Sequence, residues 1–120
     1  MGMNGQSIDR ILFDNVIELR LSKSASIAIT GSFEYTDPTG KLSVLSIEQG
    51  ATSCATVLES LGKVIASGVV TEEGGLDVRF HDRSSFYIAP DNDFEAWEVN
   101  GDPCASKIIS MPGGKLAIWD

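Results

Sequence analysis

The sequence predicts a mainly β (α+β) fold: an antiparallel, partly closed sheet or sandwich of about eight to ten short strands with one covering helix. Apolar and polar residues alternate over most of the chain, which is typical of half-buried strands. Short runs rich in Gly, Pro, Asn and Asp separate the alternating segments and are typical of turns. A helical spacing of apolar residues occurs near residues 53–61.

In the first half of the chain, two alternating runs place their apolar residues on one face. The run at 15–22 does so with Ile17, Leu19 and Leu21, and the run at 26–36 with Ile27, Ile29, Phe33 and Tyr35. "KSAS" between them indicates a hairpin connection. "DPTG" (Asp37 to Gly40) has Pro at the second position of a β-turn, where its fixed φ suits the geometry. The run at 41–47 is expected to form the next strand.

The helix is expected between Thr52 and Gly62. Its apolar stripe is formed by Cys54, Val57, Leu58 and Leu61, at positions i, i+3, i+4 and i+7. We expect Thr52 or Ser53 to cap its start and Gly62 to end it in a left-handed conformation. A helix of about three turns must be stabilised by packing on the sheet.

The second half of the chain returns to strands. The run at 76–80 places Leu76, Val78 and Phe80 on one face, and the run at 85–89 alternates Phe86 and Ile88 with polar neighbours. "EEGG" at 72–75 and "HDRS" at 81–84 are expected turns. "FEAWEV" is followed by "NGD", a strong turn signal, and "SKIISM" and "KLAIWD" form an expected hairpin across "PGG".

Length and charge limit the classes of function. The 120 residues are expected to form one domain, 1–120, with residues 1–7 as a flexible tail. No apolar run is long enough for a membrane helix and the start lacks secretory features, so a cytoplasmic protein is expected. The net charge of −8 argues against nucleic acid and anionic membranes as partners. On charge alone, simple solubility is the favoured interpretation, and steering toward a basic protein is the alternative.

The two cysteines indicate no metal site. Cys54 and Cys104 lie far apart in the sequence, and neither belongs to a CxxC pair. In a cytoplasmic protein we expect buried thiols, and a disulfide remains open if the chain functions elsewhere. We expect no cofactor.

The acidic stretch "PDNDFEAWEVNGD" (Pro90 to Asp102) allows three interpretations. A calcium loop is disfavoured because Ala96 stands where such a loop needs glycine and no helices flank it. A catalytic pair of carboxylates is disfavoured because Glu95 and Glu98, three residues apart on a strand, point to opposite faces. The third interpretation, which we favour, is an acidic surface that meets a basic partner.

No catalytic residue is predicted. His81 in "RFHDRSS" lies in an expected turn, and neighbouring His, Asp and Ser do not form a triad, whose members come from separate elements. "MPGGK" lacks the remainder of a phosphate-binding loop and no helix follows it. A hydrolase that uses His81 is the least favoured alternative.

The acidic surface is expected to combine carboxylates with an aromatic anchor. Alternation places Glu95, Trp97 and Val99 on one strand face; core packing is the default for a tryptophan, but a partly exposed Trp97 would anchor a contact. The last residue, Asp120, is expected to add to the same acidic end. The predicted partner-binding residues are Asp91, Asp93, Glu95, Trp97, Glu98, Asp102 and Asp120.

The segment "DNDFEAWEVNGD … SMPGGKLAIWD" resembles the ending of a family of small, uncharacterised bacterial β-rich proteins. In that family an aromatic-Glu-Ala-Trp-Glu segment precedes a Pro-Gly-Gly hairpin and a terminal Trp, and no activity is established. In size and acidity the chain is also similar to immunity proteins of bacterial competition systems such as contact-dependent inhibition. These resemblances imply a non-enzymatic inhibitor of a basic toxin, with a nuclease as the expected kind. A small-molecule-binding β domain, with its pocket between the sheet and the helix, is the alternative.

Overall fold

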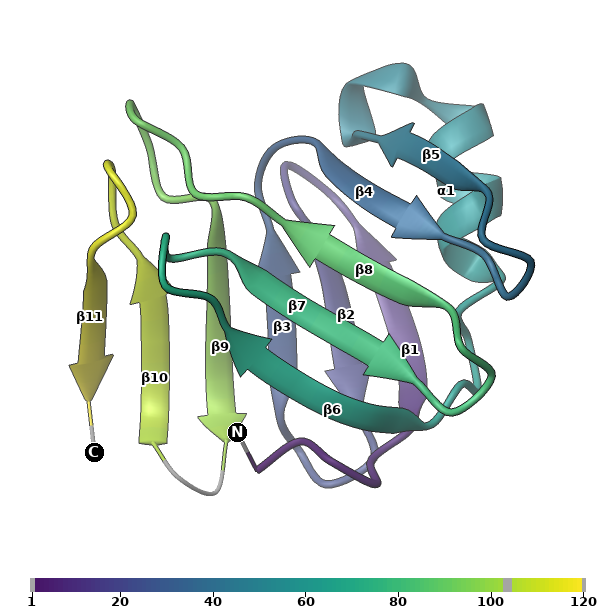
Figure 1. Cartoon of the computed structure of the whole chain (residues 1–120), viewed down its shortest axis with the longest axis horizontal. Coiled ribbons are helices and arrows are strands. Elements are labelled where there is room, and N and C mark those ends of the chain that lie inside the picture. Colours follow the sequence, from purple (N-terminus) through teal and green to yellow (C-terminus); the bar gives the residue numbers. More distant parts are fainter. Residues whose placement is uncertain (1, 103–104, 120) are drawn as a thin grey trace.

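The structure, a computed structural model, describes residues 2–102 and 105–119. These residues form two antiparallel sheets that stack face to face without closing into a barrel (Figure 1). The six-stranded sheet has the order β1 (Ile8–Phe13), β2 (Ile17–Leu21), β3 (Ser26–Ile29), β9 (Trp97–Asp102), β10 (Ala105–Ser110), β11 (Leu116–Trp119). The five-stranded sheet has the order β5 (Leu42–Leu45), β4 (Phe33–Thr36), β8 (Ser85–Ile88), β7 (Leu76–Phe80), β6 (Ile65–Val70). The mainly β prediction is confirmed, with eleven strands in the described residues.

The core lies between the two sheets, and the predicted alternation fills it. Ile17, Leu19 and Leu21 are buried along β2, and Leu76, Val78 and Phe80 along β7. The run at 26–36 was expected to keep one face throughout. It instead divides into β3 and β4, which belong to different sheets. Its odd-numbered apolar residues are all buried nonetheless, because both sheets turn their inner faces to the same core.

The helix is shorter than expected and has a different start. A 3₁₀ turn, η1 (Ile47–Gln49), leads into α1 (Ala51–Leu58), and Gly50 stands at the N-cap in place of Thr52 or Ser53. Ser53 is buried, and its hydroxyl donates to Gln49 Oε1 (2.7 Å) and accepts from the backbone N–H of Ser46 (3.2 Å). Ser53 therefore ties the helix to the η1 turn instead of capping it.

The predicted apolar stripe of the helix is buried at one position only. Val57 is fully buried, Cys54 is half-buried, and Leu58 and Leu61 are about half exposed. Helical spacing therefore identified the element but not the extent of the face that packs. Gly62 does have a left-handed φ of +86°, although the helix ends four residues before it.

The structure differs from the sequence-based expectation at two further places. "NGD" (100–102) was expected to be a turn, but β9 continues through it, and Gly101 accommodates a φ of +71° within the strand. Residues 1–7 were expected to be a flexible tail. From Met3 onward the chain is packed: Met3 and Gln6 are buried, and Gln6 accepts a hydrogen bond from the backbone N–H of Lys23.

Among the described residues, no helix is both long and apolar enough to cross a membrane.

Candidate functional site

Three connections meet at one end of the sandwich, which we call the acidic end: the β6–β7 turn (71–75), the β8–β9 loop (89–96) and the β10–β11 turn (111–115). The first and third touch through glycine backbones. A Cβ on Gly74 would lie 2.1 Å from the carbonyl oxygen of Gly114, and both glycines have φ near +90°. The backbone N–H of Gly113 donates to the carbonyl of Asp91 (2.8 Å), which joins the third connection to the second. Segments distant in sequence therefore form one surface.

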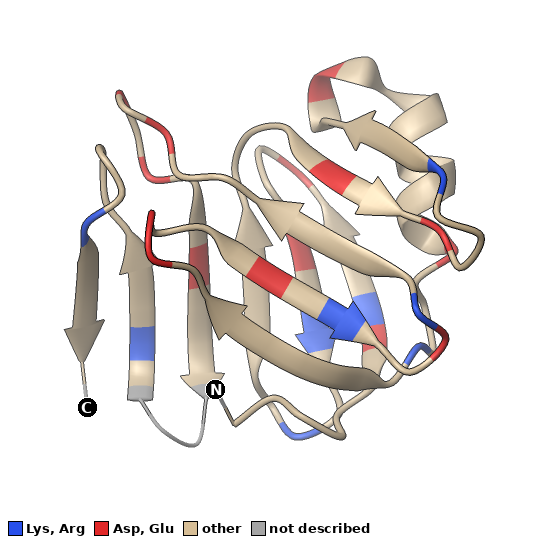
Figure 2. Cartoon of the chain, in the orientation of Figure 1, with Lys and Arg blue, Asp and Glu red and all other residues tan. Residues whose placement is uncertain are grey.

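Carboxylates are concentrated on this surface (Figure 2). The acids of the first two connections are Glu72, Glu73, Asp91, Asp93 and Glu95. Four of them are exposed and Asp91 is half-buried. None of the five forms an ion pair with a described residue, whereas Glu18, Asp77, Asp82 and Glu98 each do. Within the three connections, Lys115 is the one cation. The charge of this end is therefore mostly uncompensated.

Local hydrogen bonds hold the acidic end in shape. Asp91 Oδ1 accepts the backbone N–H of Asp93 (2.8 Å), which fixes the start of the β8–β9 loop as an Asx turn. Tyr87, on the outer face of β8, donates its hydroxyl to Glu73 Oε1. Burial raises the pKa of Tyr87, and the hydrogen bond to the Glu73 carboxylate raises it further. Tyr87 therefore remains a neutral donor to the Glu73 carboxylate.

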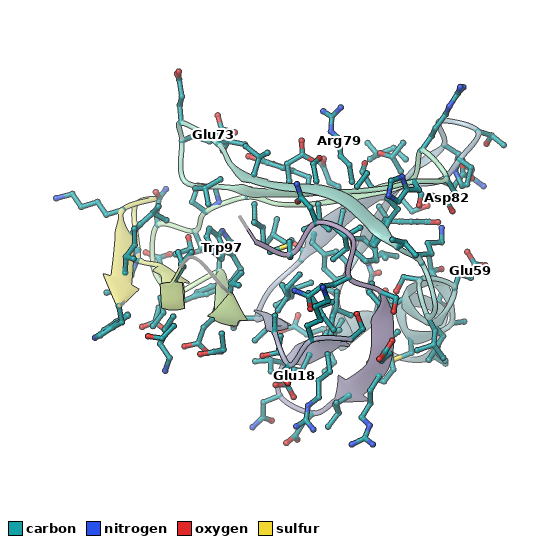
Figure 3. The ribbon with its side chains drawn as sticks, turned by 90° about the horizontal axis from the view of Figure 1, so that it is seen from below. Glu18, Glu59, Glu73, Arg79, Asp82 and Trp97 are labelled. Carbon is teal, nitrogen blue, oxygen red and sulfur yellow. The ribbon has the colours of Figure 1, made fainter. Side chains whose placement is uncertain are left out.

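Trp97 takes the default core position and is not an exposed anchor. Its side chain is 1% exposed, and it lies between the two sheets (Figure 3). The indole Nε1 donates to the carbonyl of Gly74 (3.1 Å), which Ser110 Oγ also approaches (3.4 Å). Trp97 is packed in the core because it begins β9, and the odd-numbered residues of β9 continue the inner face of β3. Trp97 supports the acidic end from beneath.

Phe94 occupies the exposed position instead. Its ring is 43% exposed, and its inner edge rests over Gly31, where an added Cβ would lie 3.4 Å from Cε2. The ring lies beside a shallow depression that is also lined by Thr30, Glu95, Met111 and Pro112. Residues 94–96 precede β9 and do not follow strand alternation, since Ala96 is buried while Phe94 is not.

Two of the other predicted binding residues, Glu98 and Asp102, do not join this end. Glu98 lies on the outer face of the six-stranded sheet, where Lys107 pairs with it (3.4 Å). Asp102 ends β9, five residues beyond Trp97 and thus at the opposite end of that strand. Asp120 lies outside the described residues. The structure therefore separates the predicted set and retains Asp91, Asp93 and Glu95.

His81 has no catalytic arrangement around it. It is exposed in the β7–β8 turn, and within the described chain its ring makes no hydrogen bond. The adjacent polar cluster is centred on Lys63, whose Nζ donates to Tyr35 Oη (2.9 Å) and Ser84 Oγ (2.8 Å) and pairs with Asp82 Oδ2 (2.9 Å). Ser84 also donates to Asp82 Oδ1.

This cluster is suited to stability and not to nucleophilic chemistry. A Ser–Lys nucleophile would need a neutral lysine. Burial lowers the pKa of Lys63, but hydrogen bonds to Tyr35 and Asp82 outweigh it, and the pKa is raised overall. Ser84 is also fully buried. Lys63 therefore stays charged and links the start of β6 to β4 and the β7–β8 turn.

Metal-binding groups are not assembled in the described part of the chain, where no three His, Cys, Asp or Glu side chains could share an ion. Cys54, expected to be a buried thiol, is free and half-buried. Cys104 lies outside the described residues.

Sequence reasoning missed Glu72, Glu73 and Phe94. "EEGG" was correctly predicted to be a turn, and paired acids at its tip were a visible signal. The position of this turn beside the 89–96 loop depends on the stacking of the two sheets, which no local sequence pattern encodes.

The model of a family of unknown function (DUF6188) matches residues 1–120. Comparisons with curated proteins and with solved structures found no match.

Proposed function

Since the chain belongs to DUF6188, a family of unknown function, we propose its role from the geometry: it is a non-enzymatic binding protein whose acidic end docks on a basic protein. More specifically, it is an immunity-type protein that occludes the active surface of a bacterial toxin domain, with a nuclease as the expected toxin. The observation that carries the proposal is the group of five carboxylates on adjoining connections, none of them ion-paired with a described residue.

The arrangement of charge supports a protein partner. Uncompensated acids on one side of a small protein steer it toward a basic surface and accelerate encounter, and they select against neutral and acidic surfaces. A nuclease presents such a basic surface because it must bind phosphates. In this proposal Asp91, Asp93 and Glu95 occupy positions that substrate phosphates would otherwise take.

The exposed ring supplies the second part of the contact. Interface hot spots commonly combine a rigid aromatic side chain with surrounding polar groups that exclude water. Phe94 stands between Asp93 and Glu95 and is held from below by Gly31, so it can be buried without a large loss of conformational entropy. We therefore assign to Phe94 the anchoring role that was expected of Trp97.

The backbone of the acidic end is pre-organised. Trp97, the Gly74–Gly114 contact and the hydrogen bond from Gly113 to Asp91 all order it without a partner. A surface that is ordered before binding loses less entropy on association. The arrangement is thus suited to tight inhibition.

Two experiments test the proposal: capture of the partner protein from lysate, and the growth of cells that express this partner with and without the chain. Tagged protein is used as bait in lysate of its own host at low and at high salt, and the retained protein is identified. We expect a basic protein that is released by salt, that arrests growth when expressed alone and that no longer does so when this chain is co-expressed. A retained protein without toxicity, or toxicity that the chain does not relieve, would overturn the immunity role.

The small-molecule alternative has less support. Its pocket was expected between the sheet and the helix, whereas five depressions on the described surface are lined by residues outside α1.

A further inference from the structure

β11 is an edge strand with apolar side chains exposed on both faces. It pairs with β10 alone. Ile118 is opposite Ile108 and continues an inner-face row through Val99 and Ile27, yet it is 58% exposed while the other three are buried. The reason is that β11 extends beyond the five-stranded sheet, which does not cover it (Figure 1). On the outer face, Trp119 is 49% exposed.

Two of the other three edge strands, β1 and β6, carry features that discourage pairing. The register of β1 shifts between Ile8 and Arg10, and that of β6 shifts between Ile65 and Ser67. Such bulges bend an edge strand, so that it is less able to pair with a strand of another molecule. β11 has four consecutive pairs without a shift and no charged residue within the strand, and the remaining edge strand, β5, is equally regular. A regular, apolar edge of this kind favours pairing with another strand.

The phase of the β10–β11 ladder shows which backbone groups are available. The N–H of Met111 donates to the carbonyl of Lys115 (2.7 Å), so this pair is hydrogen-bonded. Because hydrogen-bonded and non-hydrogen-bonded pairs alternate in an antiparallel ladder, Ala117 and Trp119 direct their backbone groups toward β10. Leu116 and Ile118 direct theirs outward, to the free edge.

We propose that β11 pairs antiparallel with β11 of a second copy, about a two-fold axis at Ala117, so that the two six-stranded sheets become one. In this register Leu116 of each copy is opposite Ile118 of the other, with their outward backbone groups exchanging hydrogen bonds. Both side chains lie on the inner face, so the two most exposed inner residues of the edge cover each other.

The same register complements the outer face. Lys115, one residue before the strand, comes opposite Trp119 of the second copy, where an ammonium group can contact the indole ring. A two-fold axis at Ile118 would leave Leu116 without a strand residue opposite it. With the axis at Ala117, by contrast, each of the exposed side chains Leu116, Ile118 and Trp119 has a residue of the second copy opposite it.

This dimer is expected to be weak, and salt should strengthen it. Pairing through one four-residue strand falls below the roughly 1,200 Å² of a stable interface, so we expect a dissociation constant of about 10 μM or weaker. Two chains of net charge −8 repel each other, and salt screens that repulsion. The complex at the acidic end has the opposite salt dependence, so the two proposals can fail independently.

Sedimentation equilibrium over a range of concentrations tests the pairing. We expect reversible dimerisation that increases with salt and is abolished by Ile118→Lys, which places a charge on the paired face. Val44→Lys is the matched control, because Val44 is 57% exposed on the edge strand β5 of the other sheet. A wild-type chain that stays monomeric, or a dimer that survives Ile118→Lys, would overturn the proposal.

Cross-linking tests the register. In a Cys54→Ser/Cys104→Ser background, Ala117→Cys should oxidise to a disulfide-linked dimer, because a non-hydrogen-bonded antiparallel pair holds its Cβ atoms about 4.5 Å apart. Ile118→Cys should cross-link poorly in the same background, since Ile118 is opposite Leu116. More efficient cross-linking through Ile118→Cys would show that the axis does not lie at Ala117.

Discussion

The indole Nε1 of Trp97 donates a hydrogen bond to the carbonyl of Gly74, across the interface between the two sheets (3.1 Å). Trp97 begins β9 of the six-stranded sheet, and Gly74 lies in the β6–β7 turn of the other. This bond and the Gly74–Gly114 contact position the Glu72–Glu73 turn beside the 91–95 loop. The acidic end is thus a consequence of how the sheets are joined.

Replacing Trp97 with Phe should destabilise the fold by about 1–3 kcal/mol, because it removes the donor and much of a buried ring. The free energy of unfolding from urea titration measures this. Trp119→Phe is the control, since Trp119 is half exposed and should change stability by less than about 0.5 kcal/mol. Equal losses in the two variants would contradict the role assigned to Trp97.

Replacing Gly74 with Ala should destabilise the protein more than replacing Gly40 with Ala. Both glycines have a φ of +94°, so the backbone strain of alanine is the same. Nothing lies within 4 Å of a Cβ on Gly40, whereas a Cβ on Gly74 would collide with Gly114. We expect a difference of at least about 1 kcal/mol in the free energy of unfolding. A difference near zero would show that the two turns separate readily.

The cluster around Lys63 should make stability depend on acid pH. Burial favours protonated Asp82, but hydrogen bonds from Ser84 and Lys63 outweigh it and lower its pKa from 3.8 to about 2. The ionised Asp82 carboxylate therefore contributes its full stabilisation above pH 3.8, and this contribution is lost as the pH falls toward 2.

Thermal unfolding of the wild type and of Asp82→Asn measures this contribution. The melting temperature of the variant should lie below that of the wild type near neutral pH, and the two should converge as the pH falls through this window. A constant difference down to pH 2 would show that ionisation of Asp82 does not matter.

The fold was largely predictable because strand alternation is a local property. Residues such as Leu19, Val78 and Phe86 are buried as expected, and the hairpin at 112–114 is confirmed. The run at 26–36 shows the limit of such reasoning. Its face could be assigned, but the change of sheet between Ile29 and Phe33 could not, because both strands present that face to the same core.

The candidate site was predictable only in part. Asp91, Asp93 and Glu95 are close in sequence and lie together, whereas Glu98 is separated from them because strand geometry carries it to an outer face. Glu72 and Glu73 join them through a contact between turns about 20 to 40 residues apart in sequence, which depends on sheet packing. Exposure of Phe94 rather than Trp97 was decided by where β9 begins.

The central claim is that the acidic end binds a basic partner, and the affinity of charge-matched variants for the captured protein tests it most directly. The test variant is Asp91→Asn/Asp93→Asn/Glu95→Gln. The control is Asp9→Asn/Glu34→Gln/Glu59→Gln, whose three acids are exposed and which gives the same net charge as the test variant.

Calorimetric titration at low salt should show at least about a tenfold loss of affinity, about 1.4 kcal/mol, for the test variant. The control should stay close to the wild type, and raising the salt should reduce the difference between the two variants. Equal affinities for the two variants at low salt would show that net charge, or another surface, mediates binding and would contradict the claim.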